Sequence, residues 1–401
     1  MSTQPISTSA EQSNGYRDSF VEGIRAIISK HAGSVPEMTS RLARAGFSID
    51  ALPDATSLSR VPILRKSALR DVQAGTPPWG GMLTNGFQPE ACFMSPGGIV
   101  EPLVPRMTER LSELLQAAGF DASHTVLNGF GYHFTPAGLL FHAALVRSGC
   151  TVLPAGPQNT GMQIEFASAI NANAFVGIAS HLKILLDQQP SLPIKLAMAG
   201  AEPHGESIRA QLLAQHGVRC FDMYGFAEGG ILAATCSQAG ALHLHPDVLA
   251  EVVDPVSGEL VAQGAVGELL VSLDNPGFPL LRFATGDLVA IEPGNCACQR
   301  FGVLQLMGRA DQSVRVKGML LHQSQLRRFL SRVGASACQL AVSRVDDRDR
   351  IALKVRMMGG NADMELLENG FRDACRLRTD RIEIDESLGI DICSIVDLRV
   401  K

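Results

Sequence analysis

One short stretch guides the interpretation of this sequence: FDMYGFAEGG, residues 221–230. Tyr224 offers a flat ring on which a base can stack, and Gly225 lets backbone approach a ligand closely because it has no Cβ. Glu228 can hold a magnesium ion that bridges phosphate oxygens, since hard cations prefer carboxylate oxygens. The alternative is a strand-turn-helix connection with a core tyrosine and an exposed glutamate. The stretch alone leaves both interpretations open.

Two later stretches favour a nucleotide site. They are LRFATGDL (281–288), which contains Asp287, and GRAD (308–311), which contains Arg309 and Asp311. In this order the three stretches resemble motifs of the adenylate-forming superfamily, which comprises acyl-CoA synthetases, nonribosomal adenylation domains and luciferases. In detail the chain is similar to the phenylacetate-CoA ligase branch, from about Val61 to the end. Three ordered motifs are a specific signal, whereas any one of them alone is weak.

The composition is that of an ordinary globular protein. Of the 401 residues, 46% are hydrophobic and 19% are charged, and the formal net charge is −5. These values give no basic footprint for nucleic acid or an anionic membrane. No stretch reaches the roughly 18 uninterrupted apolar residues of a membrane-spanning helix. We therefore expect neither a nucleic acid nor a membrane as a partner.

The polar N-terminus does not resemble a signal peptide, and we expect residues 1–20 to form a disordered lead-in. A cytoplasmic location is the default expectation. The sequence has nine cysteines, and an odd number in such a chain argues against a disulfide framework. Most of them should be reduced and buried as small apolar residues.

The fold class that the sequence predicts is α/β. Apolar strands at 125–128, 151–154, 174–178 and 196–199 alternate with helical segments, which indicates mixed, mostly parallel sheets covered by helices. Residues 248–254, 267–271 and 280–283 alternate like antiparallel strands of a small barrel-like subdomain, with Asp287 at a turn after the last strand. The resemblance divides the chain into an N-terminal domain (21–308) and a small mobile α+β lid domain (309–401).

The resemblance also implies roles for individual residues. Tyr224 would stack on adenine, Asp287 and Arg309 would hold the ribose, and Glu228 would bind Mg²⁺; Glu228 and Arg309 are the expected catalytic residues. Asp311 would lie at the hinge between the domains. The expected adenine-binding backbone comprises Gly200, Ala201, Glu202, Pro203, Asp222, Met223 and Gly225.

Two lysines of the family pattern are replaced in this chain. The phosphate loop of the family corresponds to Ser95, Gly97 and Gly98, but Glu101 stands at the place of its lysine. A carboxylate there should repel a triphosphate, and a plain glycine turn is the alternative. Near the end, Asp391 falls where the family has the lysine that binds the carboxylate and α-phosphate. A carboxylate cannot neutralise developing phosphate charge, and Lys401 is a possible substitute.

Two further sites follow from the resemblance. Tyr132, His133 and Phe134 lie where the family lines its acid pocket, and ordinary turn packing is the alternative. The second site is a structural zinc site, because three thiolates and one imidazole satisfy tetrahedral zinc. Its expected ligands are Cys236, His243, Cys296 and Cys298, and reduced thiols without metal are the alternative.

The resemblance implies ATP-dependent activation of a small carboxylic acid as an acyl-adenylate, followed by transfer to a thiol or amine. CoA, a carrier protein and an amine remain open as acceptors, and a homodimer is left open. Short atypical members resemble adenylating proteins of griseoluteate (phenazine antibiotic) biosynthesis, which implies an aromatic acid in secondary metabolism. The alternative function is a catalytically degenerate partner protein that binds a nucleotide or an aryl acid.

Overall fold

The computed structural model describes residues 10–54, 56–94, 98–200, 205–236, 241–292, 302–310, 313–316, 319–345, 348–359 and 363–399. The chain starts with helices that pack against a sheet built from later strands: α1 (Ala10–His31), α2 (Pro36–Arg44) and α3 (Leu69–Gly75), with short 3₁₀ turns at Leu58–Arg60 and Lys66–Ala68. Helix α1 begins at Ala10, so helix replaces part of the lead-in predicted for residues 1–20. Ile24, Ile28 and Leu42 form a buried cluster with Leu281.

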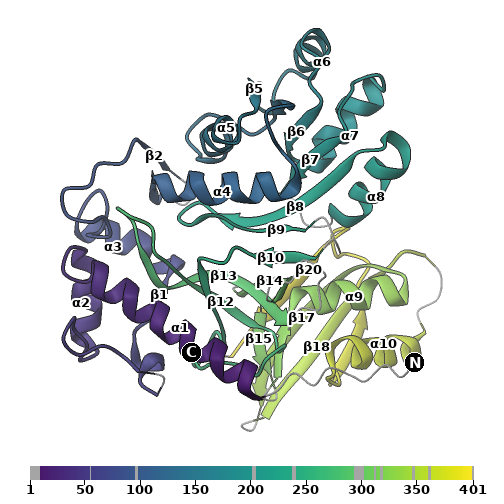
Figure 1. Ribbon diagram of the computed structural model, residues 1–401. Coiled ribbons are helices and arrows are strands. Elements are labelled where there is room, and N and C mark those ends of the chain that lie inside the picture. The colour runs from purple at the N-terminus through teal and green to yellow at the C-terminus, as the bar shows by residue number, and fades with distance from the viewer. Residues whose placement is uncertain are drawn as a thin grey trace, which may run out of the picture.

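A seven-stranded sheet forms the upper body in Figure 1. Its order is β10-β9-β8-β7-β6-β4-β5; the strands from β5 to β8 run parallel, and β9 and β10 add an antiparallel end. The strands are β4 (Thr125–Asn128), β5 (Thr151–Pro154), β6 (Ala174–Gly177), β7 (Leu196–Ala199), β8 (Arg219–Phe226), β9 (Gly230–Thr235) and β10 (Leu242–Leu244).

Five helices pack around this sheet (Figure 1). They are α4 (Pro105–Ala118), α5 (Ala137–Arg147), α6 (Thr160–Ala169), α7 (Ala179–Gln188) and α8 (Gly205–His216). All residues of the central strands β6 and β7 are buried, as expected for parallel strands covered on both faces. This coverage explains why the strands appear in the sequence as short continuous apolar runs.

A second sheet carries the antiparallel strands that the sequence predicts. Its strands are β1 (Leu64–Arg65), β11 (Val248–Val253), β12 (Gly267–Leu273), β13 (Leu280–Glu292) and β14 (Val303–Arg309). Strand β13 is longer than predicted and contains Asp287, which therefore does not lie at a turn after the strand. A separate hairpin joins β2 (Ala91–Met94) to β3 (Val100–Leu103).

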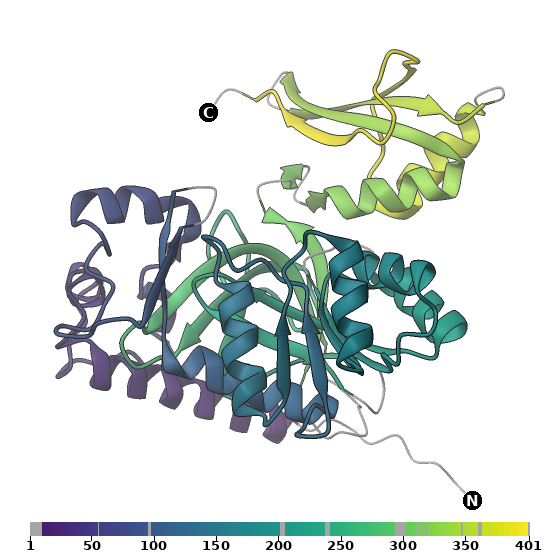
Figure 2. The ribbon, with the colours of Figure 1, turned by 90° about the horizontal axis from the view of Figure 1, so that it is seen from above.

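The C-terminal residues form a small unit with its own core. Its elements are β15 (Ser313–Val316), β16 (Met319–His322), α9 (Gln323–Val333), β17 (Ala335–Val345), β18 (Arg348–Met357), α10 (Met364–Cys375), β19 (Arg381–Ile384) and β20 (Cys393–Asp397). The sheet has the order β19-β18-β17-β20, and Phe329 and Phe371 lie in a buried cluster that involves only this unit. Figure 2 shows the unit standing apart from the larger body.

No helix in the described part of the chain combines the length and the apolar character needed to cross a membrane.

Candidate functional site

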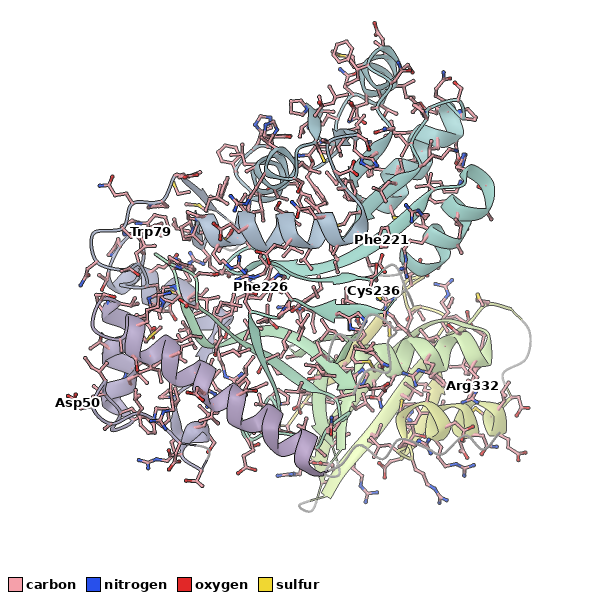
Figure 3. All side chains as sticks on the ribbon, viewed as in Figure 1. Asp50, Trp79, Phe221, Phe226, Cys236 and Arg332 are labelled. Carbon is pink, nitrogen blue, oxygen red and sulfur yellow. The ribbon has the colours of Figure 1, made fainter. Side chains whose placement is uncertain are left out.

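Several of the predicted site residues follow the carboxyl ends of parallel strands. The segment 129–138 follows β4, Gly200 follows β7, and Glu228 follows β8. In open α/β sheets, ligands bind outside the carboxyl ends of the strands. Figure 3 labels Phe221 and Phe226 toward the two ends of β8, and the Phe226 end leads into the Glu228 turn.

Tyr224, Asp287 and Arg309, one from each of the three sequence motifs, form one hydrogen-bonded cluster. The Tyr224 hydroxyl donates to Asp287 Oδ2 at 2.8 Å, and Arg309 Nη1 donates to Asp287 Oδ1 at 2.7 Å. The cluster is assembled from β8, β13 and β14, because Asp287 lies directly opposite Arg309 in the β13–β14 ladder. Burial and the neighbouring Asp287 raise the pKa of Tyr224 well above its ordinary value, so its hydroxyl remains a donor.

Gly286 creates the bend that turns Asp287 toward Tyr224. It adopts φ +77°, a conformation that favours glycine. A Cβ at this position would lie 2.6 Å from Nη2 of Arg309, so the guanidinium rests directly over the glycine. Gly286 and Asp287 are residues typical of a turn, and in the structure they form this bend inside β13.

Glu228 is buried at 0% exposure and contacts a lysine that comes from far away in the chain. Lys66 Nζ donates to Glu228 Oε2 at 3.0 Å and lies 6.0 Å from the centre of the Phe226 ring. Lys66 reaches the site because β1 pairs with β13 at Leu64–Phe283. Buried Glu228 Oε1 has no hydrogen-bond partner in the described part of the chain. An unpaired buried carboxylate oxygen is costly unless a ligand completes it.

The alternative interpretation of residues 221–230 is wrong in two respects. Strand β9, and not a helix, follows the turn, and Glu228 is buried instead of exposed. Tyr224 does pack in the core, where it is 7% exposed. Gly225 also has a structural role, because a Cβ there would lie 2.3 Å from the main-chain oxygen of Gly230.

The expected adenine-binding backbone is only partly described. Met223 packs over Gly200, where a Cβ would approach the Met223 methyl carbon to 2.7 Å. Asp222 pairs with Arg209 at 2.9 Å, which links the middle of β8 to α8. Ala201, Glu202 and Pro203 lie outside the described residues.

The three residues expected to line the acid pocket have different environments. The Tyr132 hydroxyl accepts a hydrogen bond from Asn128 at 2.8 Å and lies 3.3 Å from His142 Nδ1; burial raises the pKa of Tyr132 to about 12. His133 is exposed, and Phe134 is 83% exposed with φ +61°. The Phe134 carbonyl accepts from Met94 N, so this loop borders the β2–β3 hairpin.

That hairpin carries the predicted phosphate loop. Ser95 and Gly97 lie outside the described residues, whereas Gly98 adopts φ +73° in open space. Glu101 is fully buried on β3 opposite Phe93. The expected repulsion of a triphosphate requires a carboxylate at the surface. Strand β3 instead turns the Glu101 side chain inward.

In the described part of the C-terminal unit, no lysine stands where the family has its last lysine, because Asp391 occupies that position. Asp391 is exposed with φ +66°, and Lys354 pairs with Asp385 at 3.0 Å. Asp311 and Lys401 lie outside the described residues. The hinge role of Asp311 therefore stays a prediction.

The described part of the proposed zinc site is one β-hairpin. Cys236 N bonds to Ala241 O, and His243 pairs with Ala234, which places Cys236 and His243 on one face as diagonal neighbours. His243 Nδ1 is 2.9 Å from the Gly302 carbonyl oxygen and donates to it. Cys296 and Cys298 lie outside the described residues, and the described part contains no cluster of three His, Cys, Asp or Glu able to hold a metal.

Comparison with known proteins identifies similar enzymes. The AMP-binding enzyme family matches residues 106–275. Phenylacetate-coenzyme A ligase from Pseudomonas putida is 25% identical over 366 residues, which cover 86% of this chain and 82% of the relative. The ligase of the same name from Thermus thermophilus is 26% identical over 360 residues, covering 84% and 80%.

Two solved structures share the fold. An open conformation of 2-hydroxyisobutyryl-CoA ligase, in complex with 2-HIB-AMP and CoA, has a TM-score of 0.82 at 17% identity, covering 96% of this chain and 94% of that one. The amide bond synthetase from Marinactinospora thermotolerans has a TM-score of 0.52 at 18% identity, covering 76% and 66%.

Proposed function

This chain belongs to the adenylate-forming superfamily, in its phenylacetate-CoA ligase-like branch, and on that premise we propose that it activates an aromatic carboxylic acid as an acyl-adenylate and transfers the acyl group to CoA. The curated relatives named phenylacetate-coenzyme A ligase support an aryl acid and CoA as substrates. A carrier protein or an amine is the alternative acceptor.

The Tyr224–Asp287–Arg309 cluster is the observation that carries this proposal. An aromatic ring, a carboxylate and a guanidinium from three strands meet within hydrogen-bond distance at the carboxyl edge of the sheet. A carboxylate has about four lone-pair positions, so Asp287 can accept from ribose hydroxyls while it keeps Tyr224 and Arg309 as donors. The adenine would lie against the Tyr224 ring.

In the reaction, the substrate carboxylate attacks the α-phosphorus of ATP, and pyrophosphate leaves with the electron pair of the broken P–O bond. The thiol of CoA then attacks the acyl carbon and AMP leaves. Arg309 is 42% exposed at its side chain, so its guanidinium can reach a ribose or phosphate oxygen while Nη1 holds Asp287. Fixed positive groups aimed at developing phosphate charge stabilise such a transition state.

Glu228 is the residue that fits Mg²⁺. Its Oε1 is buried and has no partner in the described residues, and carboxylate oxygen is the preferred ligand of this ion. When bound, Mg²⁺ would neutralise charge on the phosphate oxygens. Lys66 adds a positive charge at the same carboxylate, where its ammonium can bind phosphate oxygens. We propose that Lys66 supplies charge that the replaced lysines of the family motifs do not.

We also propose a structural zinc ion at Cys236, His243, Cys296 and Cys298. The donation from His243 Nδ1 to Gly302 fixes the ring tautomer with the proton on Nδ1, the arrangement common for zinc-bound histidines. Gly302 and β14 follow the segment that contains Cys296 and Cys298. Metal analysis of the purified chain should find about one zinc per chain, lost in Cys236→Ser and retained in Cys92→Ser, whose thiol is exposed. Protein free of zinc and fully stable would contradict this site.

Pyrophosphate exchange with a panel of aryl acids tests the main proposal. Acid-dependent exchange of label between pyrophosphate and ATP, followed by CoA thioester formation, is the expected result. Binding of ATP or AMP without any exchange would instead support the degenerate partner protein. Exchange without thioester formation would point to an amine or a carrier protein as the acceptor.

A further inference from the structure

The buried side chain of Arg110 lies behind the turn that presents Glu228. Arg110 is 0% exposed, and its Nη1 donates to the carbonyl oxygen of Gly229 at 3.1 Å. Its Nε donates to the two carboxylate oxygens of Asp247 at 2.9 and 3.1 Å, and its Nη2 donates to Asn275 Oδ1 at 2.8 Å. The planar guanidinium of Arg110 therefore connects Gly229, the residue after Glu228, to Asp247 and Asn275.

Helix α4, which carries Arg110, also packs directly against this turn. Gly230 adopts φ +74°, and a Cβ at Gly230 would lie 3.1 Å from Cβ and Cγ of Met107, nearly one helical turn before Arg110. Figure 1 shows α4 lying alongside β9, the strand that begins at Gly230. Packing prevents the turn from moving toward α4, and the Arg110 hydrogen bond prevents it from moving away.

Asp247 holds Arg110 because it is itself held from several sides. Arg106 Nε donates to Asp247 Oδ2 at 2.9 Å, and His245 Nδ1 lies 2.7 Å from Oδ1. His245 Nε2 reaches Glu113 Oε2 at 2.7 Å. Although burial opposes ionisation, hydrogen bonds from His245 and Arg110 hold the pKa of Asp247 well below its usual range. Asp247 is therefore a carboxylate at neutral pH.

We infer that Arg110 is a positioning residue, which fixes the carboxylate of Glu228 through Gly229 and thereby sets the affinity of the site for a divalent cation. The inference rests on the proposed function, in which Glu228 is the ligand. Lys66 is the one described ion-pair partner of Glu228 and comes from a separate strand. Because Lys66 holds only Oε2, the main chain that carries Glu228 also determines where Oε1 points. Loss of such outer partners weakens metal binding by roughly 10- to 100-fold in other sites.

The test is a Mn²⁺ titration of the full chain, followed by electron paramagnetic resonance in the presence of α,β-methylene-ATP. Arg110→Lys keeps the charge but cannot bond to Gly229, Asp247 and Asn275 together, so the Mn²⁺ dissociation constant should rise about tenfold or more. Arg282→Lys is the matched control. Arg282 is 1% exposed, pairs with Glu251 at 2.9 Å and donates to the main-chain carbonyls of residues 58, 59 and 61. It does not contact the Glu228 turn through these bonds, so Mn²⁺ affinity should change less than about twofold.

Asp247→Asn provides a second variant, because it loosens Arg110 without altering Gly229 or the arginine. It should weaken Mn²⁺ binding by about threefold to tenfold, with far-UV circular dichroism unchanged. The inference is wrong if folded Arg110→Lys or Asp247→Asn binds Mn²⁺ as tightly as the unaltered chain does. It is also wrong if Arg282→Lys loses as much Mn²⁺ affinity as these variants. Neither result would contradict the proposed function. If the unaltered chain binds the analogue but takes up no Mn²⁺, the metal role of Glu228 fails and the inference fails with it.

Discussion

At the residue scale, Asp287 accepts hydrogen bonds from Tyr224 and Arg309 and is expected to accept more from ribose. Asp287→Ala should weaken AMP binding by roughly 10- to 100-fold, since hydrogen bonds to charged groups contribute about 1.5–3 kcal/mol. Isothermal titration calorimetry measures the loss. Tyr224→Phe removes one donor and keeps the ring, so its loss should be smaller. If Asp287→Ala binds AMP as tightly as the unaltered chain does, Asp287 does not hold the ribose.

Lys66 is the second residue whose replacement is informative. Lys66→Met keeps the length and packing of the side chain but leaves Glu228 without its described ion-pair partner. The rate of pyrophosphate exchange should fall by about 100- to 1,000-fold, because removing one donor aimed at developing negative charge costs roughly 2.7–4 kcal/mol in other enzymes. Arg65→Met is the neighbouring control, since Arg65 pairs with Glu268 away from Glu228. A normal exchange rate in Lys66→Met would show that this charge is dispensable.

The sequence motifs single out Tyr224, Glu228, Asp287 and Arg309 as candidates, because each lies in a short ordered pattern. Lys66 escaped notice as a site residue, because its contact with Glu228 spans 162 positions and depends on how β1 joins β13. The burial of Glu101 was equally invisible, since a strand of four residues does not reveal which face is inside. Residues that belong to short motifs could therefore be predicted from the sequence. Contacts and burial that depend on the pairing of distant strands could not.

At the scale of elements, His322 connects the small unit to β14. It caps α9 through a capping box, and its ring is hydrogen-bonded to the backbone of Met307. Burial and the nearby Arg328 lower the pKa of His322 from 6.5 to about 4. Between these pH values the unfolded chain binds a proton that the folded chain does not, so the free energy of unfolding falls as the pH drops through this window.

His322→Asn tests this pH dependence, because asparagine is also a good helix cap. The unaltered chain should lose on the order of 2–3 kcal/mol more stability between pH 7 and pH 4.5 than the variant does. Urea unfolding at both pH values, followed by circular dichroism, gives the two differences. Parallel losses in both chains would mean that His322 titrates at its ordinary pKa.

Elements with a strong local signal were predicted well. The strands β4, β5 and β7 have the predicted bounds, because continuous apolar runs alternate with amphipathic segments. Strand β13 was predicted too short, since Gly286 and Asp287 are typical of a turn. Cross-strand pairing with β12 and β14 keeps the chain extended on both sides of that bend.

For the whole molecule, separate cores predict separate unfolding. Phe329 and Phe371 pack edge to face at 5.8 Å inside the small unit, while Trp79, the only tryptophan in the sequence, lies in the larger body. Phe371→Ala should destabilise the small unit by about 3–5 kcal/mol. In a urea titration, circular dichroism should then show a separate unfolding transition of the small unit at a lower urea concentration. The midpoint measured by Trp79 fluorescence, which reports on the larger body, should not change. A joint shift of both probes would show that the two parts unfold together.

The strand β14 gives this molecule a mechanical property. Its last residue, Arg309, grips Asp287, and only residues 310–312 separate it from β15 of the small unit. Under the proposed function, Arg309 would bind the ribose at this end of β14, a few residues before the small unit begins. Nucleotide binding at Arg309 would then be coupled to the orientation of the small unit, because so few residues connect the two.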